Sequence, residues 1–85
     1  GIMKNTNDFV VEISSDLDYE EMVANILYKE ELVAIISQEN GLQNLRIEII
    51  PQFEVNSWNF LLEEFIEALH LGKKRLIEMQ KLPEL

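Results

Sequence analysis

The dipeptide Asn40-Gly41 lies between two apolar runs, and it constrains the fold more than any other feature of the sequence. Both residues tolerate a positive φ angle, so the pair is typical of the two-residue turn of a β-hairpin. Counting outward from such a turn, every pair on one face is apolar: Ile36 with Leu45, Ala34 with Ile47, and Leu32 with Ile49. The pairs on the other face carry the polar residues: Ser37 with Asn44, Ile35 with Arg46, and Val33 with Glu48. A slip of one residue would destroy this separation, so the pattern predicts two paired strands in one register.

Two further strands are predicted before this hairpin. Within residues 8–13, Phe9, Val11 and Ile13 alternate onto one side, which is typical of a strand. Residues 22–28 leave two alternatives open, because they fit a strand as well as a helix over residues 18–28 that is capped by Asp18 and Glu21. We favour the strand, because a three-residue loop over residues 29–31 keeps its core face apolar. The resulting pairs are Tyr28 with Leu32, Ile26 with Ala34, and Ala24 with Ile36.

The last third of the chain has the period of a helix. Pro51 ends the fourth strand, because it cannot donate a ladder hydrogen bond. From about Leu61, apolar residues recur at three- and four-residue steps and form one stripe: Leu62, Phe65, Ile66, Leu69, Leu76 and Met79. Gly72 lies on this stripe and leaves two alternatives: a close approach of the helix to the sheet, or a C-cap that divides the helix.

These elements predict an α+β fold. We expect one domain over residues 1–85, with an antiparallel meander of about four strands and one long C-terminal helix packed on one face. Gly1 and Ile2 precede Met3, and we interpret residues 1–7 as a tag and flexible start. Residues 82–85 are expected to form a frayed tail.

The charge of the chain indicates which partners suit it. Sixteen acidic residues against seven basic ones give a net charge of −9, and residues 5–67 contain fourteen acids but only two bases. Such a surface repels nucleic-acid phosphates and attracts a basic protein. The sequence has no cysteine and no apolar stretch of bilayer length. We therefore expect a cytoplasmic protein that binds neither nucleic acid nor membrane.

The sequence predicts no catalytic chemistry. His70 is the only histidine and has no cysteine to complete a zinc site, so we expect a partly buried or surface side chain. The three glycines form no phosphate-binding loop, and most acids are expected to be solvated. We predict that the chain is not an enzyme and has no catalytic residue, metal or cofactor.

Two kinds of surface are candidates for partner binding. In the predicted register, four apolar side chains share the sheet face that the helix does not cover: Val23, Leu27, Val33 and Ile35. If nothing packs there, they form an exposed apolar patch, which usually marks an association surface. A helix over residues 18–28, or burial by the N-terminal segment, would remove that patch. The second candidate set is acidic: Glu30, Glu31, Glu63 and Glu64. Trp58 is interpreted as a lid over the sheet edge, with an interface anchor as the alternative.

Two longer runs resemble a known class of protein. They are Ile26-Leu27-Tyr28-Lys29-Glu30-Glu31-Leu32-Val33-Ala34-Ile35-Ile36-Ser37-Gln38-Glu39-Asn40-Gly41 and Trp58-Asn59-Phe60-Leu61-Leu62-Glu63-Glu64-Phe65-Ile66-Glu67-Ala68-Leu69. Together they resemble small uncharacterised bacterial proteins, some of which look like immunity proteins of toxin–immunity systems. The resemblance covers residues 9–77 and implies a non-catalytic cytoplasmic protein that binds and neutralises a cognate toxin domain. A basic nuclease toxin would suit the acidic surface. The alternative hypothesis is a homodimeric structural or regulatory module.

Overall fold

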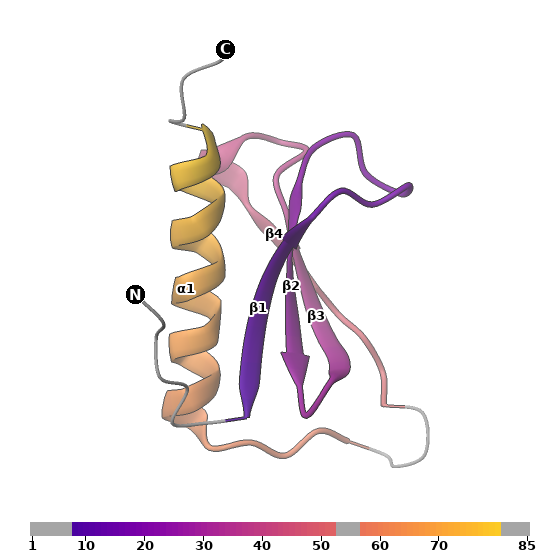
Figure 1. Cartoon of the computed structure of the whole chain (residues 1–85), viewed down its shortest axis with the longest axis vertical. Coiled ribbons are helices and arrows are strands. Elements are labelled where there is room, and N and C mark those ends of the chain that lie inside the picture. Colours follow the sequence, from indigo (N-terminus) through magenta and orange to yellow (C-terminus); the bar gives the residue numbers. More distant parts are fainter. Residues whose placement is uncertain (1–7, 53–56, 81–85) are drawn as a thin grey trace.

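The fold is a four-stranded antiparallel sheet with one helix on one face (Figure 1). The computed structural model describes residues 8–52 and 57–80. The strands are β1 (Phe9–Ser14), β2 (Val23–Tyr28), β3 (Glu31–Ser37) and β4 (Arg46–Ile49), in the spatial order β1-β2-β3-β4, and the helix is α1 (Leu62–Gln80). The predicted α+β meander with a long helix is confirmed. The expected flexible start and frayed tail lie outside the described residues.

The strand alternative for residues 22–28 is confirmed, and the helix alternative over residues 18–28 is wrong. β2 pairs with β1 along its length, and Val11 faces Ile26 at the centre. Phe9, Val11 and Ile26 are buried on the same side of the sheet, as the alternation of their side chains requires. The alternation of apolar side chains therefore predicted this segment correctly, whereas the helix-capping pattern of Asp18 and Glu21 did not.

The turn between β2 and β3 differs from the prediction. It contains two residues, Lys29 and Glu30, with φ angles of 48° and 71°. Tyr28 consequently faces Glu31 instead of Leu32. Two positive φ angles are the mark of a type I′ turn, whose twist matches that of the strands.

A register shift corrects for the shorter turn. It falls between Ile26 and Leu27 and leaves Val33 as the extra residue of β3. Beyond it, Ile26 faces Ala34 and Ala24 faces Ile36, as predicted. The bulge thus restores the predicted pairing in the half of the strands where the core is packed.

The connection between β3 and β4 also differs from the prediction. Ile36 faces Ile47 instead of Leu45, and Ala34 faces Ile49, so the register is displaced by two residues. The predicted two-residue turn is wrong because only Gly41 of the Asn40-Gly41 pair has a positive φ angle, 91°. A short 3₁₀ helix (Leu42–Asn44) follows it and lengthens the connection. A displacement by two keeps Ala34, Ile36, Ile47 and Ile49 on their predicted face, since the side-chain period of a strand is two.

Helix α1 continues through Gly72 and lies very close to the sheet there. A Cβ atom built on Gly72 would be 3.0 Å from Ile36 Cδ1 and 3.3 Å from Ala24 Cβ. The alternative of close approach is confirmed, and the alternative of a divided helix is wrong. The buried line of the helix consists of Ala68, Gly72 and Leu76. These residues are four apart and share one face of the helix, and the two small ones, Ala68 and Gly72, allow the close approach, whereas Leu76 is a large buried side chain.

The ends of the predicted stripe are not buried. Leu62 in the first turn of α1 and Met79 in its last turn are both exposed. Helix α1 packs on β1 and β2, and all four residues of β4 are exposed. The helix therefore packs mainly on β1 and β2, contacts Ile36 of β3, and leaves β4 exposed. Within the described residues, no helix is long and apolar enough to cross a bilayer.

Candidate functional site

The fold brings the two predicted pairs of acids to one end of the molecule. Glu30 and Glu31 lie at the β2–β3 turn, and Glu63 and Glu64 lie in the first turn of α1. Both positions are at the lower end in Figure 1. Asp8 joins them, because its carbonyl oxygen accepts a hydrogen bond of 3.1 Å from the Lys29 amide. We call these five carboxylate-bearing residues the acidic end. All are exposed except Glu64, which is half-buried.

Aromatic rings join the elements that carry these acids. Phe60, just before α1, lies 4.7 Å from the ring of Tyr28 at the end of β2 and 4.9 Å from Phe9 at the start of β1. Phe65 in α1 lies 5.3 Å from Phe60 and 5.7 Å from Phe9. Ring pairs at such distances add to the stability of the contact beyond their buried area. These four rings and Trp58 form the aromatic cluster, which fixes the β2–β3 turn relative to the start of α1.

Trp58 closes one side of the aromatic cluster. Its ring stacks on Phe60 at 5.4 Å, and its Nε1 donates a 2.7 Å hydrogen bond to the carbonyl oxygen of Ile50. Trp58 is half-buried and packs against the core, which agrees with its interpretation as a lid. The role of interface anchor stays a prediction.

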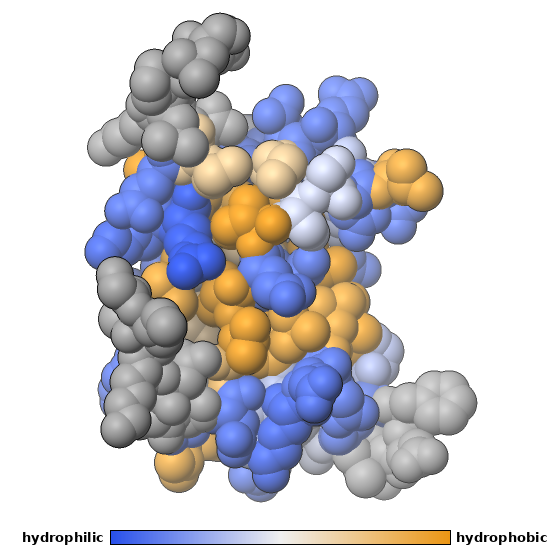
Figure 2. Space-filling model, in the orientation of Figure 1, coloured by the Kyte–Doolittle hydropathy of each residue, from blue (hydrophilic) through white to orange (hydrophobic). Residues whose placement is uncertain are grey.

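Exposed leucines lie next to the acids. Leu61 and Leu62 are each 68% exposed at the start of α1. Figure 2 shows hydrophilic side chains gathered at the lower end of the molecule, below an apolar band. The acidic end therefore combines negative charge with accessible apolar surface, which is the combination that protein interfaces use.

The potential at this end is negative. The described part of the acidic end carries five carboxylates, and the base beside them is Lys29, whose Nζ lies 5.4 Å from the centre of the Tyr28 ring. The N-terminus of α1 contributes a positive partial charge, which favours Glu63 and Glu64 in the first turn. A cationic partner approaching this end would be attracted by the remaining field.

The predicted apolar patch on the other face of the sheet is not exposed. Val23, Val33 and Ile35 are buried, and Leu27 is half-buried. A helix over residues 18–28 is not the cause, because β2 is a strand, and the N-terminal residues 1–7 of the other alternative lie outside the described part of the chain. Instead, the connection between β1 and β2 extends on the side of the sheet away from α1 (Figure 1). The partner-binding role of these four residues stays untested, but three of them present no free surface.

Hydrogen bonds join the connection between β1 and β2 to β4 and to the residues that follow β3. The Tyr19 hydroxyl donates a 2.9 Å hydrogen bond to Glu48 of β4. The Glu39 carboxylate accepts one hydrogen bond from the Glu20 amide, at 2.9 Å, and another from the Glu21 amide, at 3.0 Å. Gln38 Nε2 donates a 2.7 Å bond to the carbonyl oxygen of Met22. Sequence reasoning missed these contacts, because their partners are 16 to 29 residues apart in the chain.

The phenol of Tyr19 has a raised pKa. The hydrogen bond to Glu48 raises the pKa of the phenol above its ordinary value of 10.0, and desolvation together with the charges of Glu48, Asp16 and Asp18 adds to that rise. An acceptor carboxylate favours the protonated phenol. The raised pKa therefore reflects the hydrogen bond that joins the β1–β2 connection to β4.

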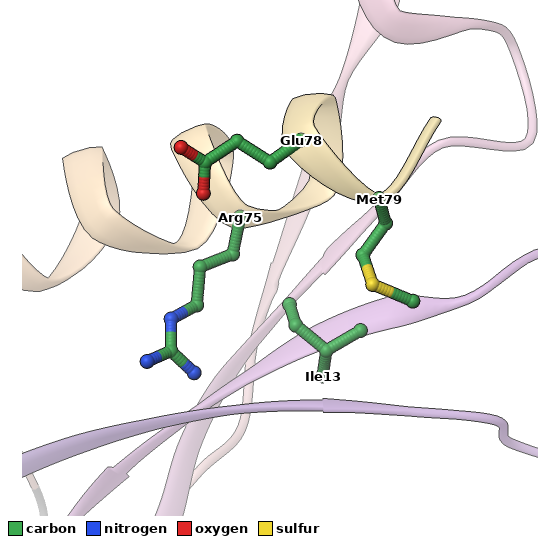
Figure 3. A pocket seen from close by; sticks show the side chains of 4 residues that line it. All are labelled: Ile13, Arg75, Glu78 and Met79. Carbon is green, nitrogen blue, oxygen red and sulfur yellow. The ribbon is translucent and has the colours of Figure 1, made fainter. Parts of the chain in front are cut away.

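The only histidine and one surface hollow are further places to consider for a metal or a small ligand. His70 is exposed on α1, and among the residues that the structure places, no three His, Cys, Asp or Glu side chains could hold a metal ion. A hollow of about 470 Å³ is lined by Ile13, Arg75, Glu78 and Met79. In Figure 3 the Arg75 guanidinium and the Glu78 carboxylate point in different directions. The hollow is therefore lined by two apolar side chains and two separate charged ones.

Comparison with protein-family models, with curated proteins and with solved structures found no match for this chain. The expected resemblance to immunity proteins therefore stays a prediction, and the candidate site has to be argued from its geometry alone.

Proposed function

We propose that this chain is a non-catalytic protein-binding domain that holds a basic protein against its acidic end. The observation that supports the proposal is the gathering of Glu30, Glu31, Glu63 and Glu64 around the aromatic cluster. These acids come from two segments that are distant in the sequence, and the rings hold the two segments together. A charged surface on a fixed support offers a partner a surface that is already ordered before binding.

The acids would act mainly on the rate and specificity of association, and apolar groups would supply most of the affinity. Charged groups at the rim of an interface attract the partner and orient it, whereas buried apolar and aromatic groups hold it. Leu61 and Leu62 are exposed beside the acids and would provide the apolar contact. Trp58 would support it through its stacking on Phe60.

Immunity to a toxin is the specific role that we propose for this binding. An acidic inhibitor can occupy a basic cleft that serves nucleic acid, so a nuclease toxin domain suits the acidic end. We place this activity in the cytoplasm. The alternative role, a homodimer formed through Val23, Val33 and Ile35, has less support because these residues are buried.

The test compares two variants of equal charge. Glu30→Lys/Glu31→Lys and Glu20→Lys/Glu21→Lys each change the net charge from −9 to −5. The first pair belongs to the acidic end, and the second lies at the opposite end of the sheet, with exposed side chains. Tagged wild type and both variants are used to capture proteins from a host lysate, and the captured protein is then titrated with each by calorimetry.

We expect one-to-one binding that weakens with added salt and falls about tenfold or more with the first variant only. Co-expression of the wild type should also protect cells from the captured protein. Equal affinity of both variants, or a strength of binding that does not respond to salt, would contradict the proposal. Circular dichroism of each variant separates lost binding from lost folding.

A further inference from the structure

Among the described residues, no strand pairs with the outer edge of β4. Strand β4 ends the sheet order, and its four residues are exposed, with Ile47 and Ile49 at 47% and 52%. Beside it a groove of about 210 Å³ opens toward α1, and its lining is largely apolar: Ile36, Leu45, Arg46, Ile47, Leu69 and Lys73. An edge strand presents unpaired backbone groups that can pair with another strand. Pro51 follows this strand, but no proline lies inside it.

The sequence of β4 is complementary to itself. In an antiparallel pair of two copies centred on Ile47, Leu45 faces Ile49 of the second copy, and Arg46 faces Glu48 of the second copy. The two-fold axis repeats both contacts, so each dimer has two pairs of opposite charge and a continuous apolar row. Opposite charges and apolar groups facing each other across strands are stabilising, and facing like charges are destabilising.

The faces of the two sheets also match in this register. Ile47 faces Ile36, which contacts Gly72 of α1, so Ile47 belongs to the helix side, whereas Glu48 faces Ile35 on the other side. The residues that face each other in this register are an even number of positions apart in the sequence. Their side chains therefore lie on the same face of the combined sheet. The two copies can therefore form one continuous eight-stranded sheet with both helices on the same face.

The other edge of the sheet lacks this complementarity. If two copies of β1 pair about Val11, Glu12 faces the apolar Val10. If they pair about Glu12, two carboxylates face each other, and if they pair about Val10, Glu12 faces Asp8. Each register leaves a charge without an opposite partner, which disfavours pairing.

We propose that this protein forms a homodimer by antiparallel pairing of β4 with β4 of a second copy, centred on Ile47. This inference is independent of the proposed function, because β4 and the acidic end are different surfaces. Tyr19 does not prevent the pairing, since it bonds one carboxylate oxygen of Glu48 and the other oxygen can accept from Arg46 of the second copy. The dimer is a small-interface association that depends on concentration.

The first experiment measures mass by sedimentation and light scattering from about 1 μM to about 500 μM, where small interfaces associate. We expect a shift from 10.0 kDa toward twice that mass as the concentration rises. Ile47→Lys places two like charges at the two-fold axis and should weaken dimerisation at least about tenfold. Val10→Lys is the matched control, because it adds the same charge to the exposed side of the β1 edge and should leave the dimer intact.

The second experiment exchanges charges between the two copies. Arg46→Glu places Glu opposite Glu48, and Glu48→Arg places Arg opposite Arg46, so each variant alone should be monomeric over the same range. An equimolar mixture should form a heterodimer, because every facing pair then has opposite charges. The double variant Arg46→Glu/Glu48→Arg should form a homodimer again.

Four outcomes would overturn the proposal. They are a wild type that stays monomeric over the whole range, a dimer that Val10→Lys dissociates, a dimer that Ile47→Lys leaves unchanged, and single charge variants that do not combine when mixed. Far-ultraviolet circular dichroism shows that each variant is folded. The heterodimer remains a valid readout even if one variant is less stable, because mixing restores association only through the facing charges.

Discussion

Gly72 lies against Ile36 so closely that a methyl group on the glycine would be 3.0 Å from the Cδ1 atom of the isoleucine. The same methyl group would be 3.3 Å from the Cβ of Ala24, which the β2 backbone holds in place. The distance between helix and sheet in this protein is therefore set by the absence of a side chain at one helical position.

We predict that Gly72→Ala lowers the free energy of unfolding by about 1 kcal/mol. The cost of overpacking, about 1 to 3 kcal/mol, exceeds the gain of about 1 kcal/mol from better helix propensity. Urea denaturation measures the change. Ile36→Val removes the Cδ1 atom. Gly72→Ala should therefore lower the free energy of unfolding less in the Ile36→Val background than in the wild type. A Gly72→Ala protein more stable than the wild type would show that the sheet moves away at no cost.

Tyr19 makes the stability of the fold depend on alkaline pH. Because its pKa is raised above 10.0 in the folded state, its contribution is complete below pH 10.0 and is lost as the pH rises through the higher folded value. We expect the wild type to lose stability above that pH relative to Tyr19→Phe. A titration by ultraviolet absorbance should show a late phenol ionisation that is absent in Tyr19→Phe. If the two proteins have parallel stability profiles, Tyr19 is not bonded to Glu48 in solution.

The Glu39 carboxylate accepts hydrogen bonds from two backbone amides, so its replacement should make the connection between β1 and β2 less rigid. Glu39→Ala removes the acceptor of both amides, and we expect a loss of about 1 kcal/mol, which is below the usual value for bonds to a charged group because the site is exposed. Hydrogen exchange of the Glu20 and Glu21 amides should become faster. Glu67→Ala removes an exposed helical carboxylate and is the control, in which these two amides should keep their protection.

The Trp58 side chain joins the segment before α1 to the residue that follows β4. Trp58→Phe keeps a ring for stacking on Phe60 but removes the donor to Ile50, whose carbonyl then depends on water. We expect a loss of about 1 kcal/mol in the free energy of unfolding, the usual value of one such bond. Trp58→Leu removes the aromatic ring as well and should cost more. Equal stability of the two variants would mean that stacking contributes nothing.

The sequence predicted which side of the sheet each residue occupies more reliably than it predicted which residues face each other. Side chains alternate with a period of two, so the displacement of Ile36 from Leu45 to Ile47 left the apolar face unchanged. Turn chemistry was misleading in both hairpins. Lys29 and Glu30 adopt positive φ angles although neither residue type favours them, while Asn40 does not form the turn that its type favours.

The acidic end was predicted as a set of residues but not as one place. Nothing in the local pattern of Glu30 or Glu63 indicates that they share an end. That follows from the directions of β2 and α1 and from the contact of Tyr28 with Phe60. The burial of Val23 and Ile35 was missed for a related reason. It accompanies long-range bonds such as that of Tyr19 with Glu48, and no periodicity encodes them.

The order of the elements along the chain also has a consequence for synthesis. All four strands precede α1, and β1 and β2 pack beneath that helix. A nascent chain therefore exposes Phe9, Val11 and Ile26 to solvent until residues 62–80 have left the ribosome. During that interval the apolar face of the sheet is exposed and can bind chaperones or other nascent chains. Slow codons placed before the helix would lengthen this interval, and ribosome stalling there would favour aggregation.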